Sequence, residues 1–93
     1  MEIVIEGPRF YDQEDENIFF NCIYALPEYK EVKGKGLNLH IQLKEPITDS
    51  TVIQLVIICR RWQIAIEPLK VLKKPSNADL SLWEKQIEFT ANT

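Results

Sequence analysis

Apolar and polar residues alternate without a break from Leu37 to Leu43. Successive side chains of a β-strand point to opposite faces of the sheet, so this alternation predicts a strand with one buried face. The residues expected on the buried face are Leu37, Leu39, Ile41 and Leu43. The residues expected to face water are Asn38, His40 and Gln42. A sheet with one packed face and one wet face is typical of antiparallel pairing.

Three other segments also have strand patterns. The loop between the predicted strand at residues 29–32 and the strand at residues 37–43 contains Gly34 and Gly36 on either side of a lysine, which favours a hairpin. The last strand is followed by Pro68, which ends it or places it at an edge of the sheet. The three predicted strands are Met1–Glu6, Tyr29–Val32 and Ile64–Glu67.

Two segments have the periodicity of amphipathic helices, and each is preceded by a residue able to cap it. The first runs from the cap Asp12 to about Leu26. The second runs from about Asp49 to Trp62, after the cap Thr48, and is apolar over most of its circumference. Such a helix needs cover on more than one side. The residues expected on the buried face of the first helix are Ile18, Phe19, Cys22, Ile23, Ala25 and Leu26.

A short third helix is predicted where Leu80, Trp83 and Ile87 repeat at helical spacing. The order of elements is then β-α-β-β-α-β with a C-terminal helix, which is the split βαβ or ferredoxin-like arrangement. We therefore expect one α+β domain over residues 1–93, an open-faced sandwich with a mainly antiparallel, four-stranded sheet. Right-handed crossovers place both helices on one face of that sheet. Residues 76–93 are expected to pack on this helical face.

Charge is distributed unevenly along the chain. Residues 1–28 contain seven acidic residues against Arg9 alone, whereas residues 29–93 contain seven acidic and ten basic residues. The chain as a whole carries a net charge of −3. The acids gather at the start of the first helix, where they complement the helix dipole. They form either a solvated helix start, which is the simpler interpretation, or a patch that would attract a cationic partner. This acidic group is Asp12, Glu14, Asp15 and Glu16.

Composition and cysteine positions point to the cytoplasm. Cys22 and Cys59 fall on apolar stripes of the two helices and form no metal motif, so we expect two buried, reduced thiols. Met1 leads directly into a strand rather than into a charged and then apolar leader. The longest apolar run, Val52–Cys59, is too short to cross a membrane. We therefore expect a cytoplasmic protein without membrane association.

Residues that carry enzyme chemistry are few. His40 is the single histidine, and its expected neighbours on the wet face are polar, so we interpret it as a surface residue. No catalytic residue is predicted, and the chain is expected not to be an enzyme. No cofactor or metal site is predicted either, because Gly34-Lys35-Gly36 is too short for a phosphate loop and the acids lack calcium-loop spacing.

Nucleic-acid binding is also not expected. Residues 33–40 superficially resemble the RNP1 motif of RRM domains, since Lys33, Gly34 and Gly36 fit its opening. That motif binds RNA through aromatic side chains that stack on bases. The corresponding residues here are Lys35, Leu37 and His40. Hairpin glycines explain the match better.

Two aromatic residues stand outside the apolar face of the first helix. Phe20 and Tyr24 are four residues apart and lie side by side on its opposite side. They could be covered by Trp83 or Phe89 of the C-terminal segment, or form a homodimer contact. They could also belong to a protein-binding patch, because aromatic residues are enriched at interface hot spots. In that case the four acids nearby would form a rim that steers a basic partner.

A series of positions that begins with Asp15, Glu16 and Phe19 and continues to Pro46 and Ile47 resembles a group of short bacterial proteins of unknown role. The resemblance extends through Arg61, Trp62 and Ile64 toward Trp83, and it implies no activity. Separately, residues 25–29 are similar to a stretch of barstar-type ribonuclease inhibitors, although a basic segment follows here where those inhibitors have an acidic helix. The matching positions in the first group begin with Asp15, Glu16, Phe19, Phe20, Ile23, Leu26, Pro27, Val32, Gly34, Gly36, Leu39, Ile41, Leu43, Pro46 and Ile47.

The leading hypothesis is a non-catalytic protein-interaction domain, of the kind of an immunity or antitoxin-like inhibitor, that binds a basic protein. Its expected interaction residues are Asp12, Glu14, Asp15, Glu16, Phe20 and Tyr24. The alternative is a dimeric regulatory domain that binds a small ligand at its dimer interface. A third hypothesis, a weak enzyme built around His40, has the least support.

Overall fold

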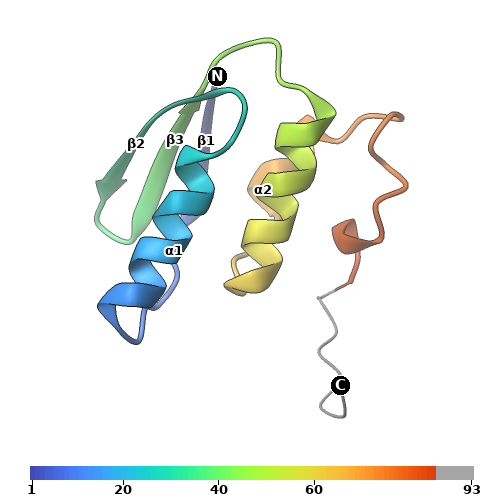
Figure 1. Cartoon of the computed structure of the whole chain (residues 1–93). Helices are drawn as coiled ribbons and strands as arrows, with labels where there is room; N and C mark the ends of the chain where they lie inside the picture. Colours follow the sequence, from blue (N-terminus) through green and yellow to red (C-terminus); the bar gives the residue numbers. More distant parts are fainter. Residues whose placement is uncertain (86–93) are drawn as a thin grey trace.

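The computed structural model describes residues 1–85 and shows an α+β fold. Three strands form an antiparallel sheet in the order β1-β3-β2. Two antiparallel α-helices lie side by side against it (Figure 1). The elements are β1 (Glu2–Glu6), α1 (Gln13–Tyr24), β2 (Tyr29–Lys35), β3 (Asn38–Leu43), α2 (Asp49–Arg61) and the 3-10 helices η1 (Glu67–Leu72) and η2 (Ser81–Trp83).

The sheet has one apolar and one polar face, as the alternation predicts. In the central strand β3, Ile41 lies opposite Ile3 of β1 and Val32 of β2, and this row faces the helices. The neighbouring residue His40 lies opposite Val4 and Lys33 on the outer face. Both caps are confirmed, because Asp12 accepts a hydrogen bond from the N–H of Asp15 and Thr48 accepts one from the N–H of Thr51.

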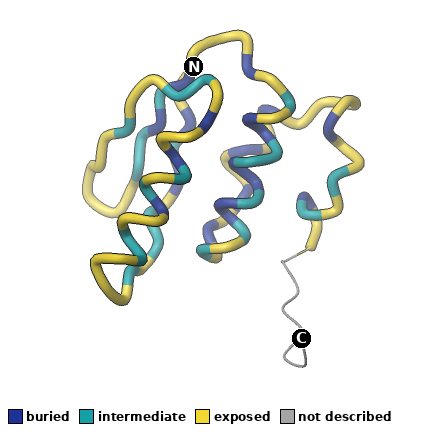
Figure 2. Tube along the Cα trace, in the orientation of Figure 1, coloured by how far each residue is buried: buried dark blue, intermediate teal, exposed yellow. Residues whose placement is uncertain are grey.

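The core lies between the apolar face of the sheet and the facing sides of α1 and α2, where Figure 2 shows the buried residues. Phe19 and Ile23 are fully buried on α1, and Leu55 and Val56 are fully buried on α2. At about 0.8 kcal/mol for each CH₂ group removed from water, these side chains supply much of the stability of the fold. Two predictions for α1 are wrong: Ile18 is 46% exposed and Ala25 is exposed.

The prediction that Leu37 is buried is also wrong. The strand begins one residue later, at Asn38, and Leu37 forms the β2–β3 turn with Gly36. Gly36 has φ +60°, a conformation that glycine adopts without strain and that a two-residue hairpin turn requires. Because the turn projects beyond the sheet, 81% of Leu37 is exposed.

The predicted four-stranded, ferredoxin-like sheet is wrong, because residues 64–67 form no fourth strand. Ile64 and Ile66 are buried, but they join no strand ladder, and the chain then enters η1 at Glu67. Ile66, Leu69 and Leu72 are all buried at a spacing of three, which matches the three residues per turn of a 3-10 helix. Pro68 stands in the first turn, where its missing N–H costs nothing.

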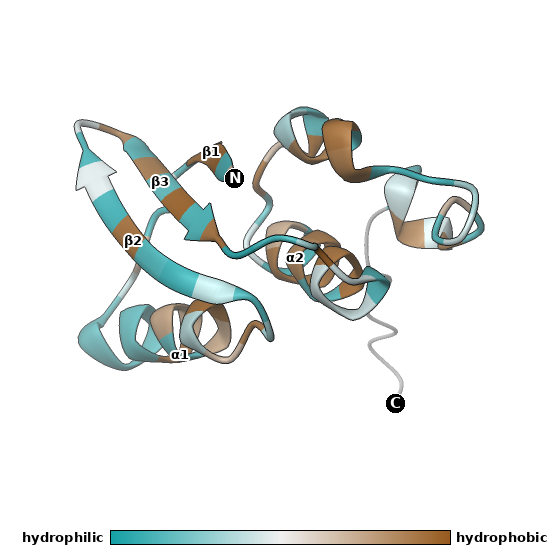
Figure 3. Cartoon of the chain, turned by 90° about the horizontal axis from the view of Figure 1, so that it is seen from above, coloured by the Kyte–Doolittle hydropathy of each residue, from teal (hydrophilic) through white to brown (hydrophobic). Residues whose placement is uncertain are grey.

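Helix η1 contacts β1, the edge strand opposite β2 in the sheet (Figure 3). The segment after it packs on α2. The buried Asn77 side chain donates to the carbonyl of Leu72 (3.1 Å) and to the Asp49 carboxylate (3.1 Å). Arg60 donates to the carbonyls of Leu82 (2.7 Å) and Trp83 (3.0 Å). The predicted third helix is only the single turn η2, and Ile87 lies outside the described residues.

Candidate protein-binding surface

The acidic residues at the start of α1 are held by the helix itself. Asp12 caps the helix through a 2.8 Å hydrogen bond from the N–H of Asp15. Glu14, Asp15 and Glu16 occupy the first turn, where the positive end of the helix dipole favours negative charge. The Glu16 carboxylate accepts a weak hydrogen bond from Gln13 at 3.4 Å. The structure therefore gathers all four acids at one end of the helix.

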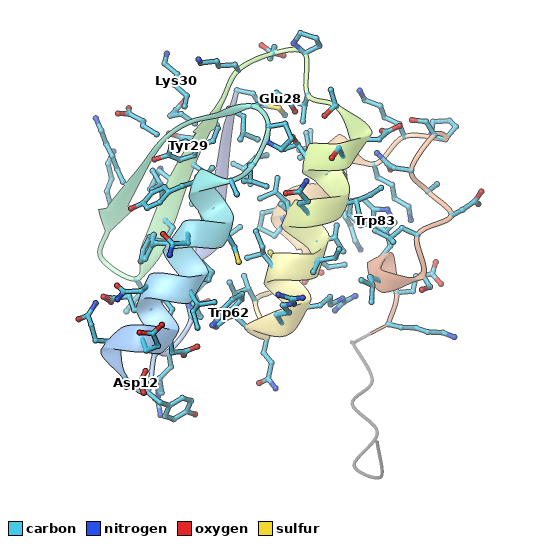
Figure 4. The ribbon with its side chains drawn as sticks, in the orientation of Figure 1. Asp12, Glu28, Tyr29, Lys30, Trp62 and Trp83 are labelled. Carbon is cyan, nitrogen blue, oxygen red and sulfur yellow. The ribbon has the colours of Figure 1, made fainter. Side chains whose placement is uncertain are left out.

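One of these acids joins the two helices. The indole Nε1–H of Trp62, the C-cap of α2, donates a 3.2 Å hydrogen bond to the carboxylate of Asp15. Figure 4 shows Trp62 between the start of α1 and the end of α2. Its ring also packs edge-on against Phe19, with the ring centres 5.1 Å apart. Asp15 thus has a structural role, while Glu14 stays exposed to solvent.

Next to the acidic group lies an open groove of about 1210 Å³, lined in part by residues from the start of α1 and the end of α2. Segments distant in the sequence form its walls: the β1–α1 loop, the β2–β3 turn and the segment after α2. Its charged lining residues are of both signs: Glu6 and Asp15 are acidic, and Arg9 and Arg61 are basic. A partner in this groove would therefore be selected by the arrangement of charges as well as by its net charge.

Large apolar side chains stand around this groove without cover. Tyr11 is 86% exposed, Leu37 is 81% exposed and Ile18 is 46% exposed, and all three line the groove. Tyr11 directly precedes the cap Asp12. Sequence reasoning missed these residues because the strand alternation placed Leu37 on a buried face and the helix periodicity did the same for Ile18. An isolated tyrosine in a loop beside the acids was the available signal.

Phe20 and Tyr24 lie on a different side of α1 from the groove. Their rings are 6.2 Å apart, and Tyr24 in turn packs on Tyr29 of β2 at 5.4 Å. Phe20 is half-buried against Phe19, at 5.2 Å, whereas Tyr24 is 52% exposed. This side faces β2, and neither aromatic lines the groove, although Glu16 lies one helical turn before Phe20 on α1.

Trp83 does not cover Phe20 and Tyr24. It is buried beside α2, where Figure 4 labels it, and its indole N–H donates to the carbonyl of Asn77 at 2.9 Å. The Lys73 ammonium lies 5.5 Å from the centre of its ring. The other residue considered as a cover, Phe89, lies outside the described residues.

His40 occupies the centre of the outer sheet face rather than the groove. Its Nδ1 lies 3.4 Å from a Glu2 carboxylate oxygen and makes no hydrogen bond. The other Glu2 oxygen accepts a 2.6 Å hydrogen bond from Gln42. Lys33 is the residue opposite His40 on β2. This arrangement is a cross-strand polar network on an open face.

The two cysteines differ in environment, and they form no disulfide. Cys59 is fully buried, and burial raises the pKa of its thiol to about 12, against a smaller opposing effect of Arg60. A thiol in that state is a poor nucleophile. Cys22 was also expected to be buried, but it is only half-buried on α1.

Within residues 1–85, no group of three or more His, Cys, Asp or Glu side chains is placed to hold a metal ion. In the same part of the chain, none of the helices has the length and apolarity needed to span a membrane. No family model, no curated protein and no solved structure matches the chain.

Proposed function

We propose that this chain is a non-catalytic protein-interaction domain that binds a basic protein at the end of the molecule where α1 begins. The binding residues form the α1-end surface, which we define as Tyr11, Asp12, Glu14, Asp15, Glu16, Ile18 and Leu37. The observation that carries the proposal is the 86% exposure of Tyr11 beside the acids and the groove.

An exposed tyrosine of this kind is a natural interface anchor. Tyr, Trp and Arg dominate the hot spots of protein interfaces, where truncation of one side chain costs about 2 kcal/mol or more. Leu37 and Ile18 add apolar area around Tyr11 that gains from being covered. Tyr11 and Leu37 stand on connections between elements, namely the β1–α1 loop and the β2–β3 turn, and binding residues are often found on such connections.

The acids of the α1-end surface favour a partner with positive charge. Glu14 is exposed and its carboxylate has no contact that would neutralise it within the described chain. A group of carboxylates speeds the encounter with a basic protein and repels acidic ones. A small inhibitor of a basic enzyme or toxin is a class of protein that uses such a surface. Arg9 and Arg61 in the groove would then fix the orientation of that partner.

The test is affinity capture from cell extract with the immobilised chain, followed by titration of each captured protein in purified form. We expect a captured basic protein whose affinity falls as salt rises, because surface charges are screened within about 10 Å at 0.1 M salt. Tyr11→Ala should weaken its binding about 30-fold, by the hot-spot figure of about 2 kcal/mol. Glu14→Gln should weaken binding mainly at low salt.

The matched controls are Tyr24→Ala and Glu67→Gln, which alter an exposed tyrosine and an exposed acid away from this surface. Both should bind like the unaltered chain. If Tyr11→Ala and Glu14→Gln bind every captured protein as tightly as these controls do, the α1-end surface is not the binding site.

A further inference from the structure

We propose that two copies of this chain pair through β2, strand to strand and antiparallel, with the two-fold axis at Val32. The two three-stranded sheets would then join into one sheet of six strands. This interface lies on a different part of the molecule from the α1-end surface, so the two proposals can fail independently.

In the part of the chain that the structure describes, β2 is an open edge of the sheet. It hydrogen-bonds to β3 on one side, and it is the last strand of the row β1-β3-β2 (Figure 3). Most of its residues, from Lys30 to Lys35, are exposed and only Val32 is partly buried. An edge strand presents unpaired N–H and C=O groups to solvent, and a second strand can pair with them.

The charges of β2 are complementary to themselves at one register. Glu31 and Lys33 point to the same outer face, where their charged groups are 3.6 Å apart. In an antiparallel pair centred on Val32, Glu31 lies opposite Lys33 of the second copy, and the symmetry repeats the contact. Opposite charges in directly facing positions stabilise a strand pair.

Neighbouring registers are worse. A pair centred on residue 31 places Glu31 opposite Glu31 of the second copy, and one centred on residue 33 places two copies of Lys33 opposite each other. Like charges directly opposite each other destabilise a strand pair. A pair centred on residue 34 sets Lys33 opposite Lys35. Lysines alone would protect this edge from pairing. The alternation of Glu31 with Lys33 instead makes it specific for its own copy.

The aromatic side of α1 would gain cover in the same dimer. Tyr24 and Phe20 lie on the side of α1 that faces β2, as the contact of Tyr24 with Tyr29 shows, and Figure 4 shows Tyr29 between α1 and β2. When two β2 strands pair, the two α1 helices lie next to each other on the same face of the joined sheet. The half-exposed Tyr24 then meets the second copy and loses its contact with water.

The experiment is analytical ultracentrifugation over a concentration series. The unaltered chain should show a reversible monomer–dimer equilibrium that weakens with salt. Glu31→Lys and Lys33→Glu each replace two attractive contacts with two repulsive ones, so each should raise the dimer dissociation constant about tenfold or more. The double variant Glu31→Lys with Lys33→Glu restores opposite charges across the axis and should recover the dimer.

Two matched controls separate this interface from others. Lys70→Glu alters an exposed lysine on η1 and should leave the equilibrium unchanged. Tyr24→Ala should weaken the dimer, whereas Tyr11→Ala should not. Thermal unfolding of each variant reports whether the monomer is folded. A chain that stays monomeric at all concentrations overturns the proposal, and so does a dimer that tolerates both single reversals or is not recovered by the double variant.

Discussion

The indole N–H of Trp62 donates a hydrogen bond to the carboxylate of Asp15 at 3.2 Å, and this contact joins the last turn of α2 to the first turn of α1. Two residues 47 positions apart thereby set the distance between the helices that border the groove. Asp15 was expected to contact a partner protein, but its carboxylate already accepts this intramolecular hydrogen bond and its side chain is partly buried.

Trp62→Phe should lower the free energy of unfolding by about 1–2 kcal/mol, because it removes a hydrogen bond to a charged group. The aromatic packing on Phe19 would largely remain. Urea unfolding measures the effect. In a double-mutant cycle with Asp15→Ala, the two changes should be non-additive, since both remove the same contact. Additive effects would show that the hydrogen bond contributes nothing to stability.

Gln63→Gly should stabilise the fold by about 0.5–1 kcal/mol, because a non-glycine residue with positive φ is strained. Gln63 has φ +58° and follows α2 in a Schellman motif, in which the N–H of Ile64 bonds to the carbonyl of Cys59 at 2.7 Å. Chemical denaturation gives the difference. Gln54→Gly, in the regular interior of α2, should instead destabilise the fold by about 1 kcal/mol.

Glu28 should make stability depend on pH in the acidic range. The neighbouring hydroxyl of Thr51, the N–H of Thr48 at 2.9 Å and the Thr48 hydroxyl lower the pKa of its carboxyl below 4.5. The ionised form therefore stabilises the folded chain above pH 4.5, and this contribution is lost as pH falls through the lowered pKa. Glu28→Gln should reduce the Tm at neutral pH.

The difference in Tm between the unaltered chain and Glu28→Gln should shrink steadily as the solution is made more acidic. Thermal scans across the acidic range provide the measurement. A difference that stays constant down to the lowest pH would mean that the negative charge of Glu28 plays no part in holding the start of α2.

Cys59 should have the opposite effect at alkaline pH. Its thiol stays protonated in the folded chain because the pKa is about 12, whereas the unfolded thiol ionises near 9.0. Stability is therefore complete below pH 9.0 and falls above it, by up to about 1.4 kcal/mol for each pH unit. Cys59→Ala should remove this slope, and Cys22→Ala should retain it. Equal slopes in both variants would contradict the assignment.

Thiol labelling gives a second measurement of the same difference. Cys22 is half-buried and should react with a thiol reagent in the folded chain. Cys59 should react only after unfolding, because its side chain is fully enclosed.

Local sequence rules were sufficient for the elements whose pattern agrees with their packing. The caps Asp12 and Thr48 were predictable, because a short side-chain oxygen before an apolar periodic segment has few other roles. The strand 38–43 was predictable because its burial follows the period of two. Leu37 continued that pattern, and only the turn geometry at Gly36 shows that it lies outside the strand.

The fourth strand failed because two kinds of structure share one short pattern. Ile64 and Ile66 are both buried, as they would be in a strand. The spacing that decides the structure is the one from Ile66 to Leu69 and Leu72, which crosses Pro68 and repeats every three residues. A prediction that stops at Pro68 includes Ile64 and Ile66 alone and therefore misses the spacing of three residues.

The groove could not be predicted from local patterns, because three separate parts of the chain form it. Tyr11, Leu37 and Trp62 come together only through the tertiary fold. Single-element periodicity also placed Ile18 in the core, although the end of α2 leaves it half-exposed beside this opening. The acids were predictable as a group because all four lie within residues 12–16.

The position of η1 beside β1 limits how these sheets can grow. An ordinary sheet with two free borders can add strands in both directions and so build fibres. Here the 3-10 helix η1 packs against the edge strand β1, so within residues 1–85 β2 is the edge left for a neighbour. The proposed assembly through β2 would therefore close with a pair of molecules and would not continue into a filament.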